Sequence, residues 1–322
     1  KITWTQILRA VIQAAIAAPH ATPCGEHTMN EIFGIPMSAF VGQLVIGLIN
    51  GSFYALMSLG LAIIFGLLHV VNFAHGAQYM LGAFVAWGLL EYFGISYWYA
   101  LIITPFVVGA FGLLIERLML RRLYSVDHVY ALLLTFGLAM LMEGAFRWKF
   151  GATGQPYPNP ISGGLDIGIS FIPAYRIWVI AASLMLCLTT WFVIERTKLG
   201  SYLRAANENA SLVRTFGINV PRMLMLTYGL GVGLAGFSGA MAAPIYQVNP
   251  LMGNSLIVIV FAVVVIGGMG SIIGSIITGF SLGVVEGLTK LIYPDAAGVV
   301  IFIVMIITLA IRPNGLFGQE AR

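Results

Sequence analysis

The sequence has 322 residues, of which 59% are hydrophobic and 9% are charged, with a formal net charge of +4. Soluble domains carry about 25% charged residues, so this composition excludes a soluble globular protein. It predicts an all-α, polytopic membrane protein with about eight to ten transmembrane segments, short or broken helices included. The positive charge is spread too thinly for a nucleic-acid-binding surface. Cys24 and Cys187 lie in unrelated contexts and indicate neither a disulfide framework nor a Cys-based metal site.

Residues 1–38 form an N-terminal extension that differs from the rest of the chain. Ile7 to Ala18 is a 12-residue apolar stretch that carries Arg9 and Gln13, and it is too short to span a bilayer. A signal-like segment and a helix lying on the membrane surface both remain open. We favour a third interpretation, in which Met29 is the natural start and residues 1–28 are an addition or dispensable.

The membrane domain is expected over residues 39–318, followed by a short tail at 319–322. Its first 33 residues, Ala39 to Val71, are almost continuously apolar and exceed what one crossing requires. Glycines within this stretch favour a full span followed by a short or broken one, so that the segment crosses twice. The later spans are expected at Phe73–Phe93, Tyr97–Ile115, Val129–Trp148, Ile177–Ile194, Met223–Ile245, Ile272–Leu291 and Gly298–Ile311, with a short apolar segment at Leu256–Ile266.

Basic residues distribute unevenly between the two sides of these spans. Ten fall on one side and four on the other: Arg117, Arg121, Arg122, Arg196, Lys198, Arg204, Arg214, Arg222, Arg312 and Arg322 against Arg147, Lys149, Arg176 and Lys290. The positive-inside rule makes the richer side cytoplasmic, and the Pro- and Gly-rich loop after Lys149 then faces outward. The side of the N-terminus stays open, because it depends on how often residues 39–71 cross.

Residues 195–222 form a polar, basic segment between two apolar blocks, and this segment must face water. At helical spacing one apolar stripe contains Leu203, Ala206, Ala210, Val213 and Phe216, whereas Arg204, Glu208, Ser211 and Thr215 fall on the other side. Gly217 suits a left-handed helix end, and Pro221 blocks continuation of the helix. The segment predicts one or two short helices, which either dock a partner or lie on the lipid surface.

The two halves of the chain share a pattern of an inner turn, an outward span with one Glu, and an inward span that ends at an Arg. An offset of 195 residues aligns Gly88 with Gly283 and Glu91 with Glu286. We interpret this as a topological repeat of the parallel kind.

Catalytic chemistry has no support in the sequence. The sequence has no P-loop, so an ATP-driven transporter would need a separate ATPase subunit. It also lacks HExxH and CxxC, so no metal ligand set is indicated. Ionisable groups inside the spans are scarce; Glu143 and Glu286 lie near outer ends and are interpreted as reaching headgroups. Polar residues that could line a path are Asn50, Ser52, Tyr54, Asn72, His75 and Gln78, and each has a structural alternative as an interhelical hydrogen-bonding group.

Four motifs resemble a known family. They are GLINGSFYALMSLGLAIIFGLLHVVNFAHGAQYMLGA at Gly47–Ala83, the loop RAANENASLVRTFGINVPRM, the turn GGMGSIIGS and the terminal RPNGLFG. Together they resemble the H-type permease subunits of branched-chain, or hydrophobic, amino-acid ABC transporters over about residues 39–318. One difference is Ile273, where the family usually has Pro.

The resemblance implies a non-enzymatic permease subunit of an importer in the bacterial inner membrane. Its expected partners are a second permease subunit, two cytoplasmic ATPase subunits that hold ATP and Mg, and a periplasmic substrate-binding protein. Residues of the loop expected to couple to the ATPases are Leu203, Arg204, Ala206, Glu208, Ala210, Val213, Arg214, Phe216 and Gly217. Those expected to shape structural turns are Gly76, Gly267, Gly268 and Gly270. Urea, amides or aromatic acids as cargo, and a self-sufficient channel or secondary carrier, are the alternatives.

Overall fold

The structure is a computed structural model that describes residues 31, 32, 35–68, 70–124, 126–166, 168 and 171–318. In this part of the chain, seven helices are long and apolar enough to cross a membrane, and α10 is a shorter apolar helix. The prediction of an all-α, polytopic membrane protein is therefore confirmed. The predictions for residues 1–28 and for the tail at 319–322 lie outside the described residues.

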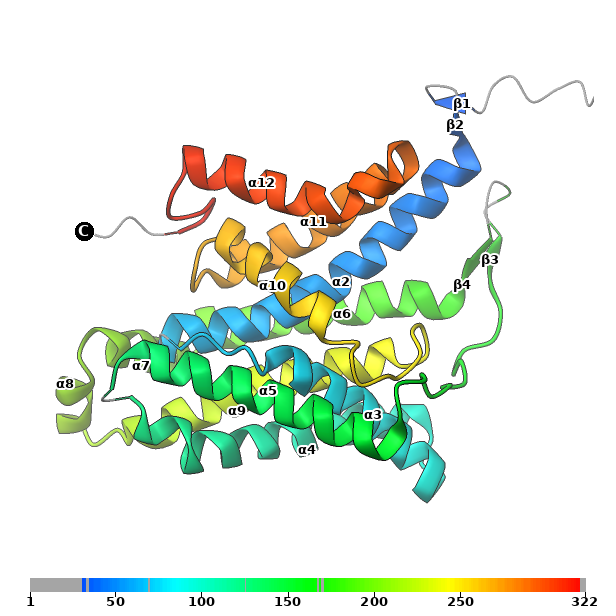
Figure 1. Ribbon diagram of the computed structural model, residues 1–322. Coiled ribbons are helices and arrows are strands. Elements are labelled where there is room, and N and C mark those ends of the chain that lie inside the picture. The colour runs from blue at the N-terminus through cyan, green and yellow to red at the C-terminus, as the bar shows by residue number, and fades with distance from the viewer. Residues whose placement is uncertain are drawn as a thin grey trace, which may run out of the picture. The chain divides into compact units, whose positions relative to one another are not determined.

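The chain divides into two units, 1–37 and 38–322. In the first unit, β1 (Glu31–Ile32) pairs antiparallel with β2 (Ile35–Pro36), with Ile32 opposite Ile35. The second unit contains the helices that are arranged in Figure 1. Their bounds are α2 (Met37–Leu68), α3 (His75–Phe93), α4 (Tyr97–Leu118), η1 (Leu120–Arg122), α5 (His128–Phe150), α6 (Ala174–Arg196), α7 (Lys198–Glu208), α8 (Ala210–Thr215), α9 (Val220–Ala242), α10 (Asn254–Gly267), α11 (Ile272–Ile292), η2 (Pro294–Ala296) and α12 (Ala297–Ile311).

The prediction that residues 39–71 split into two segments is wrong, because α2 is one continuous helix of 32 residues. Its glycines allow close packing on α11. A methyl group on Gly47 would lie 2.6 Å from the carbonyl oxygen of Gly283, and one on Gly51 would lie 3.0 Å from the backbone of Phe280. Small residues let two helix backbones approach in this way. The resulting van der Waals contacts stabilise helix packing within lipid, where the hydrophobic effect does not drive helices together.

A second close-packed centre surrounds α9, whose residues are mostly buried and which packs on α3 and α4. A methyl group on Gly82 of α3 would lie 2.2 Å from the carbonyl oxygen of Gly236 of α9. On another side of α9, Gly231 meets Gly60 of α2 at a similarly short distance. The helix is thus held by backbone contacts with three other helices.

Two helices, α3 and α10, begin inside the bundle. His75, the first residue of α3, contacts the carbonyl of Met57, so the connection after Leu68 runs back along α2 by about 16 Å. The next residue, Gly76, lies against Gly253, where a methyl group on either residue would clash with the backbone of the other. NFAHG is therefore a return segment that brings the starts of α3 and α10 together.

This contact changes the interpretation of the internal repeat. Taken in order, α2, α3, α4 and α5 run in the opposite directions to α9, α10, α11 and α12 (Figure 1). Opposite directions are the sign of an inverted repeat. The meeting of Gly76 with Gly253 pairs α3 with α10. The structure thus pairs α2 to α5 with α9 to α12 as an inverted repeat, whereas the alignment of Glu91 with Glu286 pairs α3 with α11, two helices that run in the same direction.

The two ends of the second unit have different connections (Figure 1). At one end, β3 (Gly164–Asp166) and β4 (Phe171–Pro173) form a hairpin with Leu165 opposite Ile172. At the other end lie α7 and α8. The terminal RPNGLFG closes the last turn of α10, because the backbone N–H groups of Leu316 and Phe317 donate to the carbonyls of Ile266 and Gly267 over 2.8 and 3.1 Å. These are carbonyls that a helix end otherwise leaves unpaired.

Candidate functional site

The return segment before α3 carries a buried polar network. The side-chain oxygen of Asn72 accepts from the backbone N–H of Ala74 over 3.1 Å, and its amide group donates to Gln78 over 3.0 Å. Gln78 in turn donates to the hydroxyl of Tyr228 on α9 over 3.3 Å. Asn72, Gln78 and Tyr228 are fully buried. The network satisfies polar groups where the chain leaves helical geometry, as buried polar groups require.

His75 is fully buried beside this network, and its Nε2 lies 3.0 Å from the carbonyl oxygen of Met57. Because a carbonyl only accepts, Nε2 carries the proton. The segment is also tied to α5, since the hydroxyl of Thr135 accepts from the N–H of Phe73 and donates to the carbonyl of Val71, both over 3.2 Å. In this conformation His75 therefore contacts the protein backbone and is closed off from solvent.

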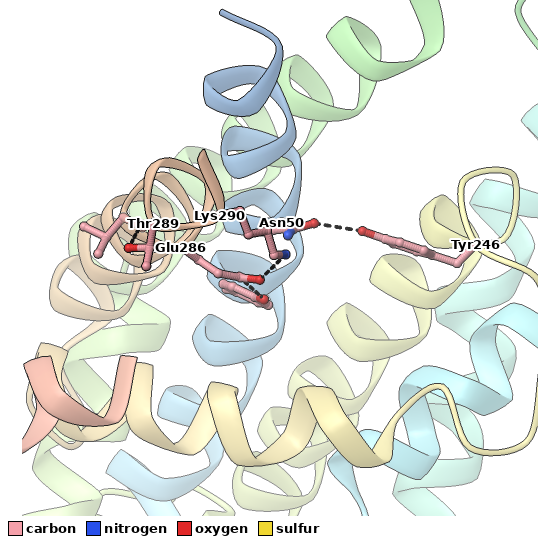
Figure 2. Close-up of polar contacts among 7 residues, drawn as sticks. Asn50, Tyr246, Glu286, Thr289 and Lys290 are labelled. Carbon is pink, nitrogen blue, oxygen red and sulfur yellow. Dashed lines mark hydrogen bonds and ion pairs between the residues drawn. The ribbon is translucent and has the colours of Figure 1, made fainter. Parts of the chain in front are cut away.

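A second polar cluster joins α2 to α11 (Figure 2). Tyr54 donates to Glu286 over 2.6 Å, and Lys290, one turn later on α11, approaches the other carboxylate oxygen over 2.5 Å. On the same helix as Tyr54, the side-chain oxygen of Asn50 accepts from the hydroxyl of Tyr246 over 2.8 Å. Each carboxylate oxygen of Glu286 thus has a partner within the protein, so the interpretation that it reaches headgroups is replaced by a role in joining helices.

The six candidate path residues therefore do not form one continuous lining. Asn72, His75 and Gln78 belong to the network at the start of α3, whereas Asn50 and Tyr54 belong to the cluster between α2 and α11. Ser52 is fully buried and donates to the carbonyl of Leu48 in its own helix over 2.8 Å. Of the six, only Asn50 is half-buried.

Two polar groupings were missed or misplaced by the sequence interpretation. On the α7–α8 side, the hydroxyl of Tyr124 donates to the fully buried Glu116 over 3.0 Å. Burial, reinforced by that carboxylate, raises the pKa of Tyr124 well above its usual range. On α5, Glu143 accepts from Asn254 at the start of α10 over 3.0 Å. Both contacts join residues from separate segments, and nothing in the sequence pattern pairs them.

Three residues of the apolar stripe of α7 and α8 face the protein interior, whereas Phe216, at its end, is exposed. Leu203, Ala206 and Val213 are buried, and the last two form a cluster with Val220 at the start of α9. These three residues were predicted to anchor another subunit, but Ala206 and Val213 already pack against the start of α9 and Leu203 is 1% exposed, so they do not offer a free docking surface. The side chain of Ala210 lies outside the described residues.

The exposed face of α7 and α8 carries a different set of residues. Tyr202 is 44% exposed, Leu212 55% and Phe216 75%, and Arg214 and Glu208 are exposed beside them. Arg204 pairs with Glu195 of its own chain over 3.3 Å, with both side chains about half exposed. Gly217 adopts the left-handed conformation expected for a helix end, with φ +79°.

The glycines assigned to turns lie at close backbone contacts. Gly267 ends α10 against Gly274 of α11, whereas Gly268 and Gly270 have positive φ angles of 102° and 87°. Gly270 also lies against Gly66 of α2. Across the described residues, no group of three or more His, Cys, Asp or Glu side chains could hold a metal ion.

The chain is similar in sequence to a known protein family and to several named permeases. The family described as "Branched-chain amino acid transport system / permease component" matches residues 43–309. The chain is 29% identical to the high-affinity branched-chain amino acid transport system permease protein LivH of Escherichia coli K12, over 87% of this chain and 96% of that protein. It is 30% identical to BraD of Pseudomonas aeruginosa, of the same description, with the same coverage. It is 26% identical to LivM of E. coli K12, over 82% of this chain and 67% of that protein.

No solved structure matches the chain. The family match covers most of the membrane helices, from the first turns of α2 to the last turn of α12. The chain belongs to the permease component family of branched-chain amino acid transport systems.

Proposed function

We propose that this protein is a permease subunit of an ATP-driven importer, which carries branched-chain and other hydrophobic amino acids across a bacterial inner membrane by alternating access. The observation that carries the proposal is the family match over residues 43–309, together with relatives named as high-affinity branched-chain amino acid permeases over 87% of the chain. The inverted repeat with two helices that begin inside the bundle is an architecture that transporters use.

The proposed assembly contains a second permease subunit, two ATPase subunits that hold ATP and Mg, and a periplasmic substrate-binding protein. The absence of a P-loop from the sequence supports a separate ATPase. The similarity to both LivH and LivM, two differently named permeases of one organism, supports a pair of related permease subunits.

The proposed contact with the ATPase is the exposed face of α7 and α8. Tyr202, Leu212 and Phe216 supply apolar area, and exposed Arg214 can pair with a carboxylate at the rim. Leu203, Ala206 and Val213 fix the orientation of this face, because they pack against the subunit itself. The basic residues on this side support its cytoplasmic location by the positive-inside rule.

The test is uptake into proteoliposomes that contain the purified assembly, with the binding protein outside and ATP inside. Leucine, isoleucine and valine should accumulate only when ATP and the binding protein are both present. Urea, an amide and benzoate serve as competing cargoes in the same assay. Uptake without ATP would assign the chain to a channel or secondary carrier, and preferential uptake of urea, the amide or benzoate would replace the amino-acid assignment.

A further inference from the structure

Glu143 is an acidic residue within a membrane helix that forms no ion pair among the described residues, although Arg147 follows it one turn later on α5. It precedes the end of α5 at Phe150 by seven residues, or about 10 Å. Its hydrogen-bond partner Asn254 begins α10, whose 14 residues extend about 21 Å toward the α7–α8 end. Arg147, the first basic residue of the last turn of α5, follows Glu143 by four residues, or about 6 Å. The Glu143–Asn254 contact therefore lies within the length of α5 that a hydrocarbon core of about 30 Å covers, toward its outer end.

The local contacts keep Glu143 at this depth. Its carboxylate accepts from the side-chain amide of Asn254 over 3.0 Å, so it does not extend to the headgroups. Within the described residues the ion pairs are Arg204–Glu195 and Lys290–Glu286, and neither involves Glu143. Glu286, by contrast, accepts a hydrogen bond from Tyr54 and pairs with Lys290, as Figure 2 shows for the lysine.

Glu143 is half-buried and Asn254 is exposed on the surface of this subunit. A carboxylate at this depth is costly against lipid and is normally found facing protein or a water-filled cavity. The pair therefore belongs to a surface that the assembled transporter turns away from lipid.

The Glu143–Asn254 pair offers hydrogen-bond acceptors to a further group. Since a carboxylate cannot donate, Asn254 must present its NH₂ group to Glu143, which leaves the amide oxygen of Asn254 free to accept from another group. A charged carboxylate with an adjacent amide oxygen matches an ammonium group, which carries three donors and no acceptor. The same arrangement repels a second carboxylate.

An apolar surface belongs to the same two helices. Phe73 packs against Phe261 of α10 with ring centroids 4.7 Å apart and against Phe136 of α5 with centroids 6.2 Å apart. Phe136 is 49% exposed, and Phe73 and Phe261 are half-buried. Both flanking helices therefore carry one member of the polar pair and one of the aromatic cluster. Glu143 and Phe136 are seven residues, about 10 Å, apart along α5, and Asn254 and Phe261 are equally far apart along α10, so each pair lies on one face of its helix.

We propose that Glu143 and Asn254 bind the α-ammonium group of the amino acid during translocation, with Phe73, Phe136 and Phe261 contacting its apolar side chain. This inference rests on the proposed function and names the residues that select amino acids over acids without an ammonium group. Glu143 is the specificity-determining residue, and Asn254 orients its carboxylate and supplies the second acceptor.

The test compares Glu143→Gln, which removes the charge and keeps the shape, with Glu143→Asp, which keeps the charge. The matched control is Glu91→Gln at the exposed end of α3. In proteoliposomes of the full assembly, Glu143→Gln should lower the maximal rate of leucine uptake about tenfold, the loss expected for one charge-assisted hydrogen bond. The half-saturating concentration of loaded binding protein should not change, Glu143→Asp should recover much of the rate, and Glu91→Gln should match the wild type.

A second measurement separates ammonium recognition from a purely structural role. With binding protein already loaded with leucine, free 3-methylbutylamine should inhibit wild-type uptake and lose this effect in Glu143→Gln, whereas 4-methylpentanoate should inhibit neither. If Glu143→Gln fails to assemble, Glu143→Cys is used in its place, in a protein without Cys24 and Cys187. Its thiol should react with a water-soluble methanethiosulfonate reagent, and turnover with leucine should slow this reaction.

Each contrary result has a distinct meaning. Equal rates for wild type and Glu143→Gln, or an unreactive Cys at position 143, would overturn this inference while leaving wild-type amino-acid import intact. Equal inhibition of wild type and Glu143→Gln by 3-methylbutylamine would also overturn it. Failure of the wild-type assembly to import any amino acid would instead overturn the proposed function.

Discussion

The hydroxyl of Tyr54 donates to a carboxylate oxygen of Glu286 over 2.6 Å, and the two residues are 232 positions apart in the chain. The contact joins α2 of the first repeat to α11 of the second. Both side chains are buried, with Tyr54 3% and Glu286 7% exposed. The glycines of the same helices allow the close approach that this hydrogen bond requires.

Tyr54→Phe should lower the free energy of unfolding by about 1.5–3 kcal/mol, because it removes a buried hydrogen bond to a charged group. The measurement is thermal unfolding of the detergent-solubilised protein. Tyr130→Phe on α5 is the control, since Tyr130 is 56% exposed. Equal unfolding temperatures for the two variants would show that the Tyr54–Glu286 contact contributes nothing to stability.

Gly76→Ala and Gly88→Ala provide a matched pair within α3. A methyl group at Gly76 would lie 2.6 Å from the carbonyl oxygen of Gly253, whereas at Gly88 the nearest atom is a side-chain carbon of Tyr92 at 3.7 Å. Gly76→Ala should destabilise the protein by about 1–3 kcal/mol through overpacking. Gly88→Ala should be neutral or stabilise it by about 0.5–1 kcal/mol. Thermal unfolding and yield of folded protein measure the difference, and the reverse order would contradict the close contact between the starts of α3 and α10.

Leu203→Ala and Phe216→Ala separate the core of the α7–α8 segment from its proposed docking face. Leu203 is 1% exposed and Phe216 is 75% exposed. Leu203→Ala should cost about 2–5 kcal/mol of stability, whereas Phe216→Ala should change it by no more than about 0.5 kcal/mol. Phe216→Ala should nevertheless reduce co-purification of the ATPase subunits and substrate-stimulated ATP hydrolysis. Full retention of both in a Phe216→Ala, Leu212→Ala double variant would place the ATPase contact elsewhere.

Cysteines at Ser162 and Ser211 should react with membrane-impermeant reagents from opposite sides. Both serines are exposed, and they lie in the loop before β3 and in α8, at opposite ends of the helices in Figure 1. The excess of basic residues predicts that Ser162 is periplasmic and Ser211 cytoplasmic. The assay is labelling of intact cells compared with inverted membrane vesicles, in a background without Cys24 and Cys187. Labelling of both positions from one side would require a different number of crossings.

The sequence by itself determined the class of protein, most of the membrane segments and the family. The length of an apolar segment and the side on which basic residues lie can be read from each segment separately. Each membrane helix must pair its own backbone hydrogen-bonding groups and match the thickness of the bilayer, whatever its neighbours are. The segment from Val129 to Trp148, for example, was predicted within two residues of α5 at its ends. The motifs around NFAHG and RPNGLFG identified the family, which the match over residues 43–309 confirms.

Tertiary structure alone decided what those segments contact. Glycine permits both a break in a helix and a close approach of two helices, and only the presence of α11 beside Gly47 and Gly51 shows that α2 is unbroken. The apolar stripe with Leu203 and Ala206 likewise fits either a partner's groove or the chain's own α9. Hydropathy records that a side chain avoids water but not which neighbour covers it, so the partner becomes known only when distant segments are packed together.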